Sequence, residues 1–86
     1  MARIAIIEDS LTDTAVFTEM LRRHGHEVIH AGNAEEGVAL VKRELPDLVL
    51  MDVILPGMNG FQATRALSRG HTTSHIPVII VSTKGM

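Results

Sequence analysis

The chain has 86 residues, a formal net charge of −2 and no cysteine. This length suits one domain with a small core, and the lack of cysteine excludes disulfides, thiolate nucleophiles and zinc–thiolate sites. The weakly acidic balance argues against general binding to nucleic acid or to a membrane surface, and two phenylalanines are the whole aromatic content.

The first residues, 1–4, lead directly into an apolar run and lack the pattern of a secretory signal peptide. No apolar stretch of the sequence has the length that a membrane-spanning helix needs. We therefore expect a soluble, cytoplasmic protein that binds neither membrane nor nucleic acid through this segment.

An apolar run at residues 4–7 opens the chain and predicts a buried strand. Residues 10–13, Ser-Leu-Thr-Asp, have the spacing of a helix-capping box, so a helix is expected from there to about residue 24. Gly25 follows it as a typical helix terminator. The inward face of this helix is expected to carry four apolar side chains: Leu11, Phe17, Met20 and Leu21.

The same alternation continues along the rest of the chain. Strands are expected at 28–31, 48–51 and 77–81, separated by helices at about 33–45 and 61–69. Strands that alternate with helices predict an α/β fold, a doubly wound parallel sheet with right-handed crossovers and helices on both faces. In such sheets, ligands bind beyond the carboxyl ends of the strands.

Acidic residues directly follow two of the apolar runs. Glu8 and Asp9 come after the first run, and Asp52 comes after the run at 48–51. Because the carboxyl ends of parallel strands meet at one edge of a sheet, these carboxylates are expected to converge there. Their oxygens suit a hard divalent cation. Ser82 follows the last apolar run and is expected at the same edge.

Histidines are the other potential metal ligands in this sequence. No two of them have the i, i+4 spacing on a helix that would make a good ligand pair. We expect all five histidines to be exposed and to take no part in the site: His24, His26, His30, His71 and His75.

Four motifs occur in order along the chain: Ile-Ile-Glu-Asp-Ser at 6–10, Leu-Val-Leu-Met-Asp at 48–52, Pro-Gly-Met-Asn-Gly at 56–60, and Ile-Pro-Val-Ile-Ile-Val-Ser at 76–82. With them the chain resembles the receiver domain of bacterial two-component response regulators, a CheY-like domain with a flavodoxin-like fold. The stretches at 24–28 and 60–65 further resemble the small stand-alone regulators of type IV pilus (twitching) and chemotaxis-like systems.

The resemblance implies that Asp52 takes a phosphoryl group from a histidine kinase, such as one of the chemotaxis type, with Mg²⁺ as the cofactor. Asp9 matches the acidic residue that coordinates Mg²⁺ directly, and Glu8 matches its neighbour, which acts through a water. The backbone carbonyl of Ile54 matches a further metal ligand. Ser82 matches the hydroxyl that hydrogen-bonds the phosphoryl group. The chain would then be a signalling domain and not an enzyme, apart from its own phosphotransfer and dephosphorylation.

The chain departs from the family at its C-terminal end. Family members continue with a further helix, a fifth strand that ends in a lysine, and a final helix, and Lys84 does not match that lysine. Residues 1–86 are therefore expected to form an incomplete receiver domain with strand order 2-1-3-4. Its last strand would leave an unpaired edge, with apolar surface of Val78, Ile80 and part of the first helix exposed, depending on the pleat. The chain is then expected to be poorly stable, or to cover that edge by self-association or strand exchange.

Two other functions stay open. A phosphorylation-independent interaction module would use the same fold as a docking surface; the missing lysine favours this reading and the three carboxylates argue against it. A Mg²⁺-dependent phosphohydrolase also uses an aspartate at a strand end. The haloacid-dehalogenase and Toprim types need an Asp-x-Asp motif, however, and Asp52 is followed by Val53 and Ile54.

Overall fold

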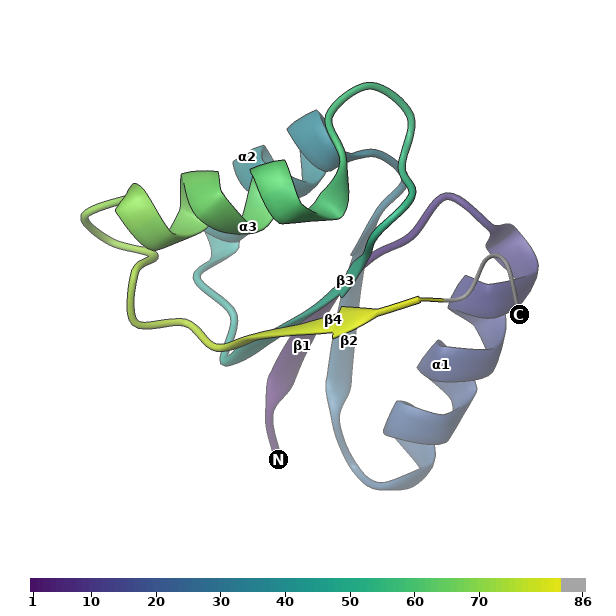
Figure 1. The fold of residues 1–86 in the computed structure, drawn as a ribbon. Coiled ribbons are helices and arrows are strands. Elements are labelled where there is room, and N and C mark those ends of the chain that lie inside the picture. Colours follow the sequence, from purple (N-terminus) through teal and green to yellow (C-terminus); the bar gives the residue numbers. More distant parts are fainter. Residues whose placement is uncertain (83–86) are drawn as a thin grey trace.

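We describe residues 1–82 from a computed structural model of the chain (Figure 1). Strands and helices alternate along it in the predicted order. The elements are β1 (Arg3–Ile7), α1 (Leu11–Arg23), β2 (Glu27–Ala31), α2 (Ala34–Glu44), β3 (Leu48–Asp52), α3 (Gly60–Arg69) and β4 (Val78–Val81). No helix in this part of the chain is long and apolar enough to cross a membrane. Lys84 lies outside the described residues.

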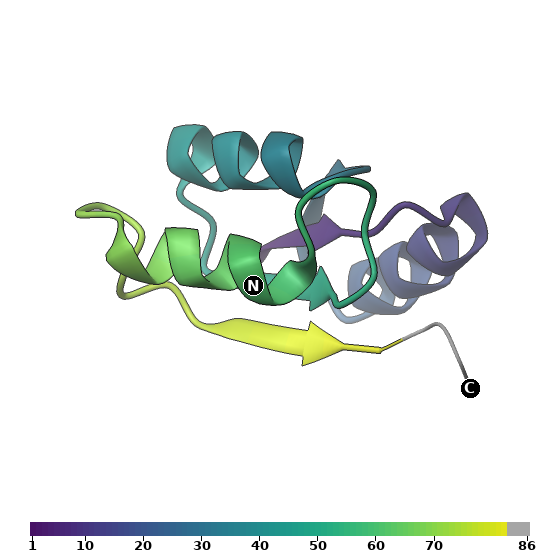
Figure 2. The same cartoon turned by 45° about the horizontal axis from the view of Figure 1, so that its top comes forward.

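The strands form one parallel sheet in the order β2-β1-β3-β4, as predicted. Ile7 in β1 lies opposite Met51 in β3, and Asp52 lies opposite Val81 in β4. Helices α2 and α3 pack side by side on one face of the sheet, and α1 lies on the other (Figures 1 and 2). The carboxyl ends of all the strands therefore meet at one edge, where β1 and β3 are neighbours.

The main core lies between the sheet and the pair of helices α2 and α3. Gly37 lets α2 approach β1 closely, because a Cβ at this position would lie 2.6 Å from Cγ2 of Ile7. The small residue is thus a packing requirement. The buried apolar residues of this cluster are Ala5, Ile7, Ala31, Ala34, Leu40, Val41, Val49, Met51, Leu55, Ala63, Leu67 and Ile76.

Helix α1 is less completely covered than its sequence suggested. Phe17 and Leu21 are partly buried, as expected for an inward face. The same prediction is wrong for Leu11, whose residue is 79% exposed, and for Met20, which is 47% exposed. The physical reason is the layer arrangement: among the described helices α1 lies alone on its face, so only the sheet covers it (Figure 2).

The last strand exposes a different side chain from the ones predicted. Val78 and Ile80 pack against the main core, because they lie opposite the buried Val49 and Met51. Ile79 points to the other face of the sheet and is 50% exposed. The predicted exposure of Val78 and Ile80 depended on the pleat of this strand, and the pleat leaves these two residues partly buried and Ile79 exposed instead.

Side-chain caps hold the first turn of each helix near the strand ends. Ser10 Oγ accepts a hydrogen bond from the Asp13 backbone N–H at 3.2 Å, as the sequence predicted. A full capping box, in which each side chain bonds the other residue's backbone, is present instead at α3 between Asn59 and Gln62, with both bonds at 2.9 Å. These caps fix where the helices begin relative to the sheet edge.

Candidate metal and phosphoryl site

Three carboxylates converge at the carboxyl end of the two central strands. Glu8 directly follows β1, Asp9 is the next residue, and Asp52 is the last residue of β3. One oxygen from each side chain lies within 4.8 Å of the others. The register explains this grouping, because Ile7 and Met51 are opposite each other and Glu8 and Asp52 each come one residue later. The structure thus brings together the three acidic residues singled out in the sequence.

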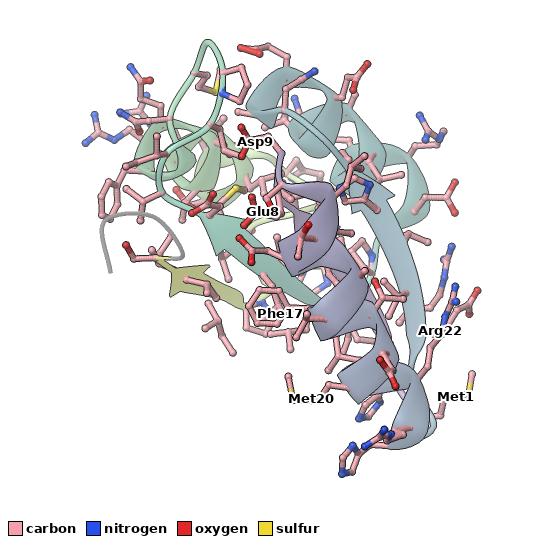
Figure 3. The ribbon with its side chains drawn as sticks, turned by 90° about the vertical axis from the view of Figure 1, so that its right-hand side faces the viewer. Met1, Glu8, Asp9, Phe17, Met20 and Arg22 are labelled. Carbon is pink, nitrogen blue, oxygen red and sulfur yellow. The ribbon has the colours of Figure 1, made fainter. Side chains whose placement is uncertain are left out.

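The three carboxylates differ in burial. Glu8 is 2% exposed and Asp52 is 3% exposed, whereas Asp9 is exposed to solvent. Figure 3 shows Glu8 and Asp9 beside the first turn of α1, with Phe17 further along the same helix. Like charges this close repel each other, and most strongly where water is excluded. A cluster of carboxylate oxygens with one open side is the donor set that a hard divalent cation such as Mg²⁺ prefers.

The carboxylate of Glu8 is held by a local turn. Its Oε2 accepts a hydrogen bond from the Ser10 backbone N–H at 2.8 Å. Its own backbone N–H donates to the Ala31 carbonyl at 3.1 Å, which continues the pairing of β1 with β2 by one residue. Glu8 is therefore fixed at both its backbone and its side chain.

The loop after Asp52 is anchored at several points. Gly57 has a φ of +75°, the left-handed region that favours glycine. The Met58 backbone N–H donates to Glu35 Oε1 of α2 at 3.1 Å, and the Gly60 N–H donates to the Val53 carbonyl at 2.8 Å. These two hydrogen bonds hold the loop after Asp52 against α2 and fix the start of α3 to the residue that follows β3.

Ile54 and Ser82 complete the set of predicted site residues. Ile54 lies in the loop two residues after Asp52, and its residue is 54% exposed. Ser82 follows Val81, which is the residue opposite Asp52 in the sheet, and it is exposed at the same edge. Both residues therefore lie in segments next to the acidic cluster.

One histidine contacts this site, which the sequence analysis did not anticipate. His30 is exposed, as expected, but its Nε2 lies 2.8 Å from the backbone carbonyl oxygen of Glu8. His26 and His24 are also hydrogen-bonded, to the Ala2 N–H at 3.0 Å and to the Met20 carbonyl at 2.9 Å, both away from the carboxylates. The available signal was the period of two in the second strand, which places His30 on the α1 face with its partner Ile6.

Comparison with known proteins decides which family has this arrangement. A family model described as the response regulator receiver domain matches residues 4–86. The chain belongs to the response regulator receiver family. Receiver domains act as phosphoacceptors in two-component signalling.

Individual relatives agree with the family. The chain is 57% identical to protein PilH of Pseudomonas aeruginosa over 84 residues, which is 98% of this chain and 69% of PilH. It is 36% identical to the response regulator PleD of Caulobacter vibrioides, over 94% of this chain and 18% of PleD. The predicted resemblance to receiver domains is confirmed.

Solved structures share the fold. The N-terminal domain of a response regulator receiver protein from Methanoculleus marisnigri is 30% identical with a TM-score of 0.93, covering 100% of this chain and 70% of that one. The receiver domain of a sensor histidine kinase from Pseudomonas aeruginosa, described with a magnesium ion coordinated in its active site cleft, is 27% identical with a TM-score of 0.91. It covers 99% of this chain and 70% of the other. The predicted flavodoxin-like sheet order is confirmed.

Proposed function

We propose that Asp52 is the phosphoacceptor of this receiver domain and that it takes a phosphoryl group from a phosphohistidine of a histidine kinase. Glu8, Asp9, Asp52 and the Ile54 carbonyl would hold Mg²⁺, and the Ser82 hydroxyl would hydrogen-bond the phosphoryl group. The observation that carries the proposal is the approach of three carboxylate oxygens to within 4.8 Å of one another at the end of β1 and β3. The similar receiver domain with bound magnesium supports the choice of metal.

The proposed transfer needs little covalent machinery from the protein. An oxygen of the Asp52 carboxylate bonds to phosphorus while the bond from phosphorus to the histidine nitrogen breaks, and that electron pair stays on the imidazole. Mg²⁺, when bound, neutralises charge on the carboxylates and on the phosphoryl oxygens. The chain itself supplies position, because Asp52 is the last residue of β3 and is 3% exposed, so its backbone is held in the sheet.

We infer that the chain acts as a signalling domain, with its own phosphotransfer and dephosphorylation as its only reactions. The alternative, a phosphohydrolase, would turn over phosphate esters many times per molecule. An assay with a chromogenic phosphate ester separates the two, because a receiver domain accepts one phosphoryl group and then stops until it loses that group.

The pathway is part of the same proposal. The 57% identity to PilH supports a role in a type IV pilus (twitching) pathway with a histidine kinase of the chemotaxis type as the donor. The proposed location is the cytoplasm. We further propose that the chain self-associates through β4, which pairs with β3 alone among the described strands.

Intact-mass spectrometry after incubation with acetyl phosphate tests the function directly. We expect one phosphoryl adduct that requires Mg²⁺ and that is lost in Asp52→Asn. Asp47→Asn, a matched change at the other end of β3, should keep the adduct. If the folded chain forms no adduct, the phosphoacceptor proposal is wrong, and binding of a partner that is unchanged in Asp52→Asn would identify a phosphorylation-independent module instead.

A further inference from the structure

The carbonyl of Glu8 lies where the pairing of β1 with β2 ends. The Glu8 N–H still donates to the Ala31 carbonyl. Strand β2 ends at Ala31, the residue after His30, so the His30 side chain lies beside this end of the ladder.

The side chain of His30 donates a hydrogen bond to the Glu8 carbonyl. Its Nε2 lies 2.8 Å from the Glu8 carbonyl oxygen, and a carbonyl only accepts, so Nε2 carries the hydrogen. The same nitrogen lies 3.3 Å from Thr14 Oγ1, whose hydroxyl donates to the Ser10 carbonyl at 2.8 Å. The histidine thus connects β2 with the end of β1 and with the first turn of α1.

This contact acts on the peptide that joins two proposed metal ligands. The Glu8 carbonyl belongs to the peptide plane between Glu8 and Asp9, so its hydrogen bond sets the direction in which the Asp9 backbone continues. The Ser10 N–H fixes the Glu8 carboxylate from the other side of the turn. The segment from 8 to 10 is therefore held at the carbonyl, at the carboxylate and through the helix cap.

We propose that His30 is a positioning residue, which holds the Glu8–Asp9 peptide so that the two carboxylates face a divalent cation. This inference rests on the proposed function, because it assumes that the acidic cluster binds Mg²⁺. His30 touches neither metal nor phosphoryl group; it acts through the Glu8 carbonyl. Groups that orient metal ligands in this way commonly contribute a factor of about 10 to 100 in affinity.

Calorimetric titration of the full chain with Mg²⁺ tests the proposal, with His30→Leu and His30→Gln beside the unchanged protein. His30→Leu removes the donor and should weaken Mg²⁺ binding about 10-fold. His30→Gln keeps an N–H near the position of the ring Nε2, so it should restore affinity to within about three-fold of the unchanged protein. His24→Leu is the matched control, because His24 also donates to a backbone carbonyl but far from the carboxylates, and it should leave affinity unchanged.

Unfolding midpoints measured without metal show whether each variant is folded at the titration temperature. Equal affinity in His30→Leu and the unchanged protein would overturn the positioning role while leaving the proposed function intact. Equal loss in folded His30→Leu and His30→Gln would also overturn it, because the hydrogen bond would then be irrelevant. An unchanged chain that binds no Mg²⁺ would instead refute the proposed function, and this inference with it.

Discussion

Gly60 lies directly against the backbone carbonyl of Asp52, with no room for a Cβ between them. The Gly60 N–H also donates to the Val53 carbonyl at 2.8 Å, and the Met51 side chain closes the remaining space. The first residue of α3 is thus packed on the strand that carries the proposed phosphoacceptor. Backbone atoms cannot move aside as a flexible side chain would, so glycine is required at this position.

Gly60→Ala should therefore lower the free energy of unfolding by about 1–3 kcal/mol, the usual cost of overpacking. Urea denaturation followed by circular dichroism measures it. Gly32→Ala is the matched control, because a Cβ there meets no atom within 4 Å and the backbone φ is ordinary. If both variants show the same stability as the unchanged protein, the close packing at Gly60 is not as described.

The acidic cluster should make stability depend on Mg²⁺. Without metal, Asp9→Asn should raise the free energy of unfolding by about 0.5–1 kcal/mol, because it removes one of three repelling charges at an exposed position. With Mg²⁺ at about 100 times its dissociation constant, the unchanged protein should gain about 2.7 kcal/mol and the variant much less. Thermal unfolding with EDTA and with MgCl₂ measures both effects. A loss of stability in metal-free Asp9→Asn would contradict the repulsion argument.

The contact between Glu35 and the loop after Asp52 should be visible in amide hydrogen exchange. Glu35→Ala removes the acceptor of the Met58 N–H, and a hydrogen bond worth about 0.5–1.5 kcal/mol corresponds to exchange about 2- to 12-fold faster at Met58. Glu35→Gln keeps an oxygen acceptor and should show a smaller change. Unchanged protection in Glu35→Ala would mean that the loop holds its shape without this contact.

Acid should weaken the pairing of Arg3 with Glu44. The guanidinium donates to the Glu44 carboxylate at 2.6 Å and holds its pKa below the ordinary value of 4.5. A carboxyl whose pKa is lowered in the folded state stabilises it above the unfolded pKa, and this stabilisation is lost as the pH falls through the folded pKa. Glu44→Gln should therefore lose less stability than the unchanged protein between pH 6 and pH 3, roughly the window of carboxyl titration.

Urea midpoints across that range measure the difference. Glu36→Gln removes an exposed carboxylate from the same helix and serves as the control. Identical pH profiles for Glu44→Gln and the unchanged protein would show that the ion pair contributes nothing to acid sensitivity.

The edge formed by β4 should mediate self-association. Ile79 is half-exposed on a strand that pairs with β3 alone among the described residues, which is the kind of edge that pairs with a second copy. We expect sedimentation coefficients that rise with concentration and that return to the monomer value in Ile79→Lys. Leu11→Lys, at a more exposed apolar residue on α1, is the control and should not change the association. A compact monomer at all concentrations would refute the prediction.

The order of strands and helices, and the location of the site, could be read from the sequence because both depend on local patterns. Short apolar runs predict buried strands, and the segments between them predict helices because their apolar residues recur about every 3.6 positions. The acidic residues lie at the ends of two such runs, and a parallel sheet places those ends together whatever the details of packing. For the same reason the sequence alone groups Glu8, Asp9 and Asp52.

Other features depended on contacts between residues far apart in the chain, which no local pattern specifies. The pleat of β4 exposes Ile79 because of its register with β3, and Leu11 is exposed because α1 packs on the sheet alone. The hydrogen bond from His30 to the Glu8 carbonyl joins residues 22 positions apart, which the pairing of β2 with β1 brings together. The sequence by itself thus determined which residues meet at the site. The tertiary structure decided which neighbours form hydrogen bonds with them, because such bonds need short distances between residues that are far apart in the chain, and only the packed sheet sets those distances.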